Sequence, residues 1–320
     1  MNGITLKWQQ VNAWRLSRHG LSPRLSRHQL VEAAARTGGI QAQVMSAAEL
    51  ALWARVDHLS PDAVQSALWH KRTLVKTWAM RATLHLLPAD DLPLYVAARS
   101  VYETRNWLAY FTFFGITPAQ YEAFLAAIPQ VLGSEPLTRE QLANATAEFI
   151  GAPEIGERLL SSSWGSLWKP SAWRGDLCFG PNQGRNPTFV RPSQWFGRWQ
   201  PVEPYPALQE IARRYLSAYG PATPEDFALW WEINKVPAKK LFQSIADELV
   251  DVEVEGWCAS ALRSTLAPIQ EMEPASSINI LPLFDAYVLG LDHNNEIIVP
   301  RAPTTAKPKI ISPTGILPAP

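Results

Sequence analysis

The sequence has few cysteines, no net charge and no long apolar run, and each shortage excludes a class of protein. Cys178 and Cys258 are its only cysteines and lie far apart, which excludes a disulfide framework and a cysteine-rich zinc site. The 29 basic and 29 acidic residues cancel, so no overall field favours nucleic acid or a membrane surface. No run approaches the roughly 20 apolar residues that cross a bilayer, and the N-terminus carries no apolar signal segment. We therefore expect a cytoplasmic protein without membrane contact.

Familiar catalytic motifs are absent as well. The chain has no Walker phosphate loop, no Rossmann glycine pattern, no His-Glu-x-x-His and no Gly-x-Ser-x-Gly, and its six histidines are scattered. We therefore expect neither a metal nor another cofactor. What the chain does have is a hydrophobic fraction of 47%, 14 tryptophans and 27 prolines, and the prolines fall mainly between predicted helices. This composition is typical of a globular protein built from many short helices.

One stretch combines two glycines with two glutamines. Gly38 and Gly39 can end the preceding predicted helix, because glycine tolerates a positive φ. If the backbone is extended after them, Gln41 and Gln43 point the same way and Ala42 points the other way. Two neutral amides can hold a water molecule or a polar ligand edge, but they cannot act as a strong base. On spacing alone a second interpretation stays open, in which both amides satisfy backbone groups of the turn.

Hydrophobic periodicity and capping residues predict the same order of elements three times. The first set has helices at 5–19, 30–36, from Ser46 (a capping box with Glu49) and at 60–70, then strands at 73–80 and 82–87. The second has helices at 117–132, 138–150 and 155–167, strands at 173–179 and 188–191, and a flexible tip at 180–186. The third has helices at 207–219, 223–233 and 237–249, then strands at 250–254 and 257–260.

Helices followed by a small hairpin form a winged-helix unit. The predicted fold class is therefore mainly α with small β wings, arranged as three tandem winged-helix units. We expect their boundaries at 1–100, 101–200 and 201–320. Residues 279–290 are apolar and are expected to pack as a strand and turn against the third unit. The proline-rich end, from Lys307, is expected to be a loose tail.

Charged residues near the hairpins are candidates for nucleic-acid contacts. Arg72, Lys76 and Arg81 flank the first hairpin, and the second carries Arg174, Arg185 and Arg191. Solvated charges without a ligand are the alternative for both sets. His85 on the second strand of the first hairpin is more often structural than a ligand in such a position.

The carboxylates are more easily explained by structure than by catalysis. Asp90 and Asp91 stand at a helix start, where they are expected to cap amide groups. Asp285 lies in an apolar stretch, so it needs a partner, either an arginine or backbone donors. None of the three is expected to be a catalytic acid or base.

Several short motifs are similar to one known family. They are Gly39-Ile40-Gln41-Ala42-Gln43, Trp53-Ala54-Arg55, Thr77-Trp78-Ala79-Met80-Arg81-Ala82-Thr83-Leu84-His85-Leu86-Leu87-Pro88, Cys178-Phe179-Gly180-Pro181, Arg185-Asn186-Pro187-Thr188, Ala212-Arg213-Arg214-Tyr215 and Leu281-Pro282-Leu283-Phe284-Asp285. As a set, over roughly residues 8–300, they resemble the winged-helix DNA glycosylases of the AlkZ/YcaQ type, in the branch with a Gln-x-Gln motif.

The resemblance implies a monofunctional DNA glycosylase that hydrolyses the N-glycosidic bond of N-alkylated purines and unhooks interstrand crosslinks. It implies that Gln41 and Gln43 are catalytic, and that Thr83 and His85 join the basic residues above in binding DNA. The expected partner is double-stranded DNA that carries alkylated or crosslinked purines, bound by a monomer. The alternative function is a non-catalytic winged-helix protein for DNA binding or drug resistance.

Two features depart from the family pattern. The family usually has glycine where this chain has Ala82, and we expect the alanine to restrict a close approach of this backbone to DNA. The family also continues into a final hairpin, whereas this sequence ends in the proline-rich stretch around 312–318. We therefore expect a shortened third unit.

Overall fold

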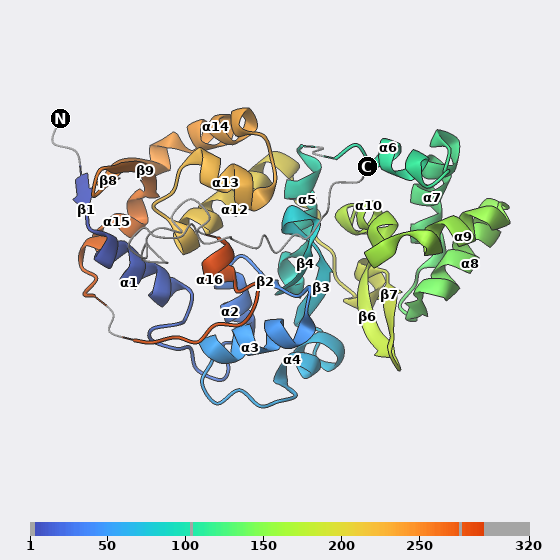
Figure 1. Ribbon diagram of the computed structural model, residues 1–320, viewed down its shortest axis with the longest axis horizontal. Helices are drawn as coiled ribbons and strands as arrows, with labels where there is room; N and C mark the ends of the chain where they lie inside the picture. Colours follow the sequence, from blue (N-terminus) through green and yellow to red (C-terminus); the bar gives the residue numbers. More distant parts are fainter. Residues whose placement is uncertain (1–3, 103–104, 275–276, 291–320) are drawn as a thin grey trace, which may run out of the picture.

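The computed structural model describes residues 4–102, 105–274 and 277–290 (Figure 1). The described part is mostly helical, with three separate three-stranded sheets among the described residues. No helix in these ranges is long and apolar enough to span a membrane. The bounds below follow the chain, and three groups of elements are called the first, second and third unit.

The first unit, residues 30–88, consists of helices followed by a hairpin. Its elements are α2 (Leu30–Arg36), β2 (Ile40–Gln41), α3 (Met45–Arg55), α4 (Ala63–Gln65), a π-helical turn (Ser66–His70), β3 (Leu74–Trp78) and β4 (Leu84–Pro88). The hairpin strands confirm the two predicted strands. The short β2 pairs with β4, so the sheet order is β2-β4-β3. Helix α5 (Leu92–Ser100) leads out of this unit.

The second unit, residues 107–190, repeats this order. It contains α6 (Trp107–Phe113), α7 (Pro118–Val131), β5 (Leu137–Thr138), α8 (Arg139–Ile150), α9 (Pro153–Ser161), a 3-10 segment (Ser163–Trp168), α10 (Lys169–Trp173), β6 (Cys178–Gln183) and β7 (Asn186–Val190). The sheet order β5-β7-β6 again places the short strand beside the last one. Strand β6 extends to Gln183, so the tip is shorter than the predicted 180–186. The short α11 (Pro192–Trp195) follows.

The third unit, residues 204–262, has the same order with one addition. Its elements are α12 (Pro204–Tyr219), α13 (Pro224–Trp231), α14 (Lys235–Ser244), β8 (Leu249–Val254) and β9 (Trp257–Leu262), followed by α15 (Arg263–Gln270). A single bridge between Ala222 and Ser260 replaces the short strand. The N-terminal β1 (Ile4–Leu6) pairs with β8 in parallel, which extends this sheet.

The N-terminal segment belongs in space to the third unit. The predicted helix 5–19 is in fact β1 followed by α1 (Trp8–Arg18). Leu6 and Val11 are buried in one cluster with Val252 and Ile269. The strand β1 and the helix α1 therefore pack with elements of the third unit.

Local capping signals predicted three helix starts and failed at a fourth. Thr117, Thr138 and Thr223 each form a capping box at the start of a helix, as predicted. The capping box predicted at Ser46 is wrong, because α3 begins one residue earlier and no side chain caps it. Its N-cap residue, Val44, continues the extended backbone that comes from the glutamines.

Two further expectations concern the C-terminal region. The predicted strand in 279–290 is wrong: the element there is the short α16 (Ala286–Leu289), whose start is capped by Asp285. The proline-rich tail from Lys307 and the expected shortening near 312–318 lie outside the described residues.

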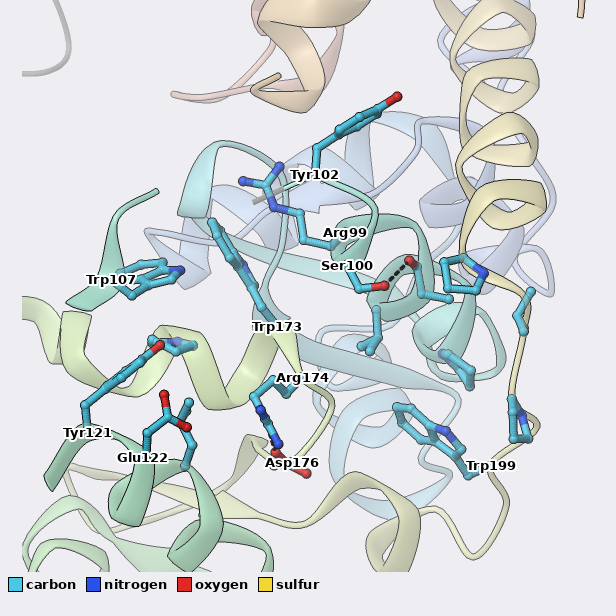
Figure 2. Close-up of a pocket in the computed structure, with 18 residues that line it drawn as sticks. Arg99, Ser100, Tyr102, Trp107, Tyr121, Glu122, Trp173, Arg174, Asp176 and Trp199 are labelled. Atoms are coloured by element: carbon cyan, nitrogen blue, oxygen red, sulfur yellow. Dashed lines mark hydrogen bonds and ion pairs between the residues drawn. The ribbon is translucent and has the colours of Figure 1, made fainter. Parts of the chain in front are cut away.

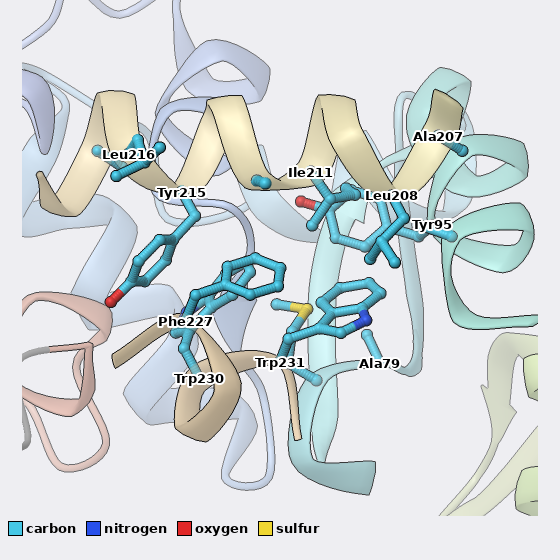
Figure 3. Packing of buried hydrophobic residues seen from close by; sticks show 14 of the residues in the cluster. Ala79, Tyr95, Ala207, Leu208, Ile211, Tyr215, Leu216, Phe227, Trp230 and Trp231 are labelled. Carbon is cyan, nitrogen blue, oxygen red and sulfur yellow. The ribbon is translucent and has the colours of Figure 1, made fainter. Parts of the chain in front are cut away.

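The sheet of the first unit packs against apolar residues on both faces. Neighbouring side chains of a strand point to opposite sides, so adjacent residues of β4 enter different clusters. Leu86 lies in a cluster with Ile40 and Leu52 of its own unit. Leu87 lies instead in the largest cluster. That cluster contains residues of α5, α12 and α13 (Figure 3). The third unit therefore packs directly against the sheet that carries the glutamine motif.

A buried ion pair joins α3 to the C-terminal segment. The Arg55 guanidinium donates two hydrogen bonds of 2.7 Å to the Asp285 carboxylate, and both side chains are 0% exposed. The expectation that Asp285 needs an arginine or backbone donors is confirmed, and Tyr287 N–H also donates to it. Asp90 and Asp91 were expected to cap amides but pair instead with Arg198 and Arg214.

Replacing Asp285 by alanine should destabilise the protein strongly, because Arg55 would remain buried without its counterion. We expect a loss of about 3–5 kcal/mol in the free energy of unfolding, measured by urea denaturation. The matched control is Glu248→Ala, which breaks an exposed pair with Arg213 and should cost less than about 1 kcal/mol. Equal losses in the two variants would contradict a structural role for the buried pair.

Candidate active site

The Gly-Gly turn places the glutamine motif, and both glycines are needed there. Gly38 and Gly39 have φ values of 67° and 109°, which confirms the expected positive φ. A β-carbon on Gly39 would lie 2.6 Å from Leu87, and one on Gly38 would lie 2.9 Å from the Trp230 ring. The Tyr219 hydroxyl also donates to the carbonyl of Thr37, at 2.8 Å. The turn is therefore held from several sides by residues far away in sequence.

After the glycines the backbone is extended, as expected. Ile40 pairs with Leu86, Gln41 pairs with His85, and the Ala42 N–H donates to the Leu84 carbonyl at 2.6 Å. Ala42 is completely buried, whereas Gln41 and Gln43 are half-buried. The side chains of Gln41 and Gln43 therefore lie on the same side of the extended backbone.

Each glutamine oxygen already accepts one hydrogen bond. Arg81 Nη2 donates to Gln41 Oε1 at 3.2 Å, and the Leu84 N–H donates to Gln43 Oε1 at 3.4 Å. Gln43 thus satisfies a backbone group, which is what the second interpretation of the motif expects. An amide oxygen has two lone pairs, so both side chains keep capacity for a water molecule or a ligand.

The turn between β3 and β4 lies beside the glutamines and is strained. Thr83 N–H donates to the Met80 carbonyl at 3.1 Å, and both Arg81 (φ 54°) and Ala82 (φ 51°) are left-handed. This is the type I′ geometry, which favours Asn-Gly. Each non-glycine residue held there costs roughly 1–2 kcal/mol. The buried Ala82 thus stands where the backbone itself favours glycine, which gives a physical reason for the family's usual residue.

His85 and Thr83 shape this turn from inside the protein. His85 is buried, and its Nδ1 lies 3.0 Å from the Thr83 carbonyl. Burial, and next the charge of Arg81, lower the pKa of His85 to about 3, so its ring is neutral near pH 7. The Thr83 hydroxyl donates to the Met80 carbonyl at 3.1 Å.

Arg72 and Lys76 lie between the first hairpin and later parts of the chain. The Arg72 guanidinium stacks 3.6 Å from the centre of the Trp195 ring and donates to the Trp195 carbonyl at 2.8 Å. Lys76 Nζ lies 5.1 Å from the centre of the Phe179 ring, and burial lowers the pKa of this lysine. Both side chains therefore help to join the first unit to its neighbour.

The three candidate arginines of the second hairpin differ in exposure. Arg185 is exposed at the tip between β6 and β7, and Arg174 is exposed and paired with Asp176. Arg191 donates to the Pro129 carbonyl at 2.7 Å. The structure brings Gln41, Gln43, Arg81, Thr83 and His85 together around one turn, whereas these three arginines lie in or directly after the second unit.

One pocket among the described residues has neither glutamine in its wall. It measures about 690 Å³ and lies between α5, α7, α10 and the segment before α12, with Trp107, Tyr121, Trp173 and Trp199 in its wall (Figure 2). Within the described ranges, no three residues of the metal-binding types cluster together.

Comparison with known proteins adds independent findings. A family model described as "DNA glycosylase AlkZ-like" matches residues 34–313. A protein of Streptomyces sahachiroi named "Interstrand DNA cross-link repair glycosylase" is 36% identical over 302 residues, which cover 91% of this chain and 79% of the relative. The solved structure of the Streptomyces sahachiroi DNA glycosylase AlkZ superposes with a TM-score of 0.84 at 35% identity. That alignment covers 93% of this chain and 81% of the other.

These matches agree with the motifs found in the sequence and extend over most of the chain. More than a third of the aligned residues are identical, and the superposition shows that the chain shares the fold of that solved structure. The chain therefore belongs to the AlkZ-like DNA glycosylase family.

Proposed function

We propose that this DNA glycosylase hydrolyses the N-glycosidic bond of N-alkylated purines, including purines joined in interstrand crosslinks, and that Gln41 and Gln43 are its catalytic residues. The observation that carries the proposal is the placement of the two amides on one side of an extended strand, above the buried Ala42. The name of the Streptomyces sahachiroi relative supports crosslinks as a substrate class.

We also propose that the units are three winged helices in tandem, within 1–100, 101–200 and 201–320. The support is their shared order of elements and, in the first two, a shared strand order of first, third, second. The Ala222–Ser260 bridge is the corresponding pairing in the third, which β1 and α1 extend.

The chemistry of the substrate explains why neutral amides are sufficient. Alkylation at N7 or N3 makes a purine cationic, so the base leaves as a neutral molecule and needs little help from an acid. The bond breaks through a sugar with oxocarbenium character. What the protein must supply is a positioned water and partial negative charge near the sugar, and the free lone pairs of Gln41 Oε1 and Gln43 Oε1 can supply both.

Water is then the nucleophile. The chain has no lysine in the motif from Arg36 to Met45, so no side chain of the motif can form a Schiff base with the sugar. The proposed enzyme is accordingly monofunctional and leaves an abasic site in an unbroken strand. It needs no cofactor for this reaction.

Double-stranded DNA is the proposed partner. The exposed Arg185 and Arg174 are suited to phosphate contacts, while Thr83 and His85 support the turn that faces the lesion. Arg72, Lys76 and Arg191 support the hairpins that carry them. We propose a cytoplasmic monomer, and the two unpaired cysteines, one of them exposed, are suited to a reducing compartment.

Replacing Gln43 by alanine should slow base release by about 100-fold under single-turnover conditions, because it removes one of the two acceptors proposed to position the water and stabilise the sugar. The substrate is duplex DNA with N7-methylguanine, and abasic sites are counted after alkaline cleavage. The affinity for the same duplex should change less than about threefold. Gln41→Ala should have an effect of the same kind.

The matched control is Gln209→Ala, which removes a half-buried glutamine whose amide donates to Ser244 on the third unit. It should leave both rate and affinity unchanged. If Gln43→Ala weakened binding as much as base release, the glutamine would be a DNA contact and not a catalytic group. Tight binding without release from any substrate, crosslinked DNA included, would favour the non-catalytic alternative.

The rate of base release should depend little on pH between 6 and 9. Glutamine does not titrate, and His85, whose pKa is lowered to about 3, gains a proton only far below this range. We expect less than about a threefold change in the single-turnover rate at saturating protein. A tenfold rise per pH unit would instead identify a general base with a pKa near neutrality.

A further inference from the structure

Arg81 connects the glutamine motif to the third unit. Its Nη1 donates to the main-chain carbonyl of Trp230 at 3.1 Å, and its Nη2 donates to Gln41 Oε1 at 3.2 Å. The two acceptors belong to elements nearly 190 residues apart in sequence. The rigid fork of a guanidinium can reach two such acceptors at once, which a single ammonium group cannot do with the same geometry.

The acceptor on the third unit is a fixed point. Trp230 and Trp231 are buried in the largest cluster, and the Trp230 ring lies 5.0 Å from that of Tyr215 (Figure 3). The carbonyls that end α13 have no partners within the helix, and arginines take them: Arg81 at Trp230 and Arg99 at Trp231. An arginine bonded to this helix end is therefore anchored to the core.

The backbone of Arg81 is held in a conformation that it would not choose alone. Its φ and ψ are 54° and 23°, and Ala82 beside it also has a positive φ. Such strain persists only where the surroundings over-determine the conformation, and it concentrates at functional sites. Here it directs the guanidinium toward Gln41 and α13, away from a position on the outer side of the hairpin.

The charge of Arg81 is unsuited to stabilising the reaction directly. The sugar gains positive charge as the bond breaks, and a guanidinium nearby opposes that charge. A hydrogen bond to Gln41 Oε1 has a different effect, because it fixes which end of the amide is the acceptor and which end carries the donors. It also restricts a side chain that otherwise samples many rotamers.

We propose that Arg81 is a positioning residue, which fixes the Gln41 amide for catalysis with the end of α13 as its anchor. The proposal rests on the proposed function, in which Gln41 acts on the substrate. This role differs from the nucleic-acid contact that the sequence suggested for Arg81.

The test is a double-mutant cycle with Arg81→Ala, Gln41→Ala and the double variant. Single-turnover base release from duplex DNA with N7-methylguanine is measured beside the affinity for that duplex. We expect Arg81→Ala to slow release about 10- to 100-fold with less than a threefold change in affinity. In the Gln41→Ala background the same substitution should change the rate less than about threefold, because the group it positions is gone.

If the rate losses of the two single variants multiplied in the double variant, the two residues would act independently, and the proposal would be overturned. A loss of affinity equal to the loss of rate would also overturn it. The matched control is Arg139→Ala, which removes an arginine that bonds the carbonyls of Leu160 and Ser162 in the second unit. Its effect on the rate should be small and the same in both backgrounds. If Arg81→Ala does not fold, Arg81→Lys takes its place in the cycle, since it retains the charge without the fork.

A second readout does not depend on catalysis. The side-chain amide signals of Gln41 in a ¹⁵N-labelled sample are assigned by their loss in Gln41→Ala. In Arg81→Ala they should move to random-coil positions, whereas Arg139→Ala should leave them unchanged. Unchanged Gln41 signals in Arg81→Ala would overturn the positioning role even if no base were released. Absence of base release with shifted signals would overturn the proposed function alone.

Discussion

The contact between Trp230 and the backbone of Gly38 is the constraint on which the site depends. The indole of α13 lies where any side chain at position 38 would have to be. This contact places the third unit on the first unit's sheet and leaves a single path for the chain into β2. The direction in which Gln41 and Gln43 point follows from that path, since alternate residues of an extended strand face opposite sides.

Several arginines join elements that are distant in sequence. Arg15 donates to the Pro221 carbonyl, Arg55 pairs with Asp285, and Arg81 and Arg99 hold the end of α13. A guanidinium that donates to a group on a distant element specifies a definite arrangement of the two elements it joins. Arg81, which was a candidate DNA contact in the sequence, thus donates a hydrogen bond within the protein. The exposed Arg185 differs from it in this respect.

Local chemistry could be predicted from the sequence, and long-range pairing could not. The caps at Thr117 and Thr138 and the positive φ of Gly38 and Gly39 depend on neighbours a few residues away. The strand at Ile4–Leu6 could not be anticipated, because its hydrogen bonds go to β8, and three residues alone carry no periodic signal. The hydrogen bond from Arg81 to Gln41 could not be predicted either, because it depends on a turn geometry that the sequence Arg-Ala disfavours.

The parallel pairing of β1 with β8 affects how the protein is made. Ile4 is synthesised long before Val252, its partner in β8. Val75 and Leu87 of the first unit likewise share a cluster with residues of α12 and α13, which are synthesised much later than they are. The contacts that complete the fold are therefore of high contact order, and their closure is expected to be slow. The described units are consequently parts of one cooperative body, and a fragment cut at a unit boundary would lose a face of its core.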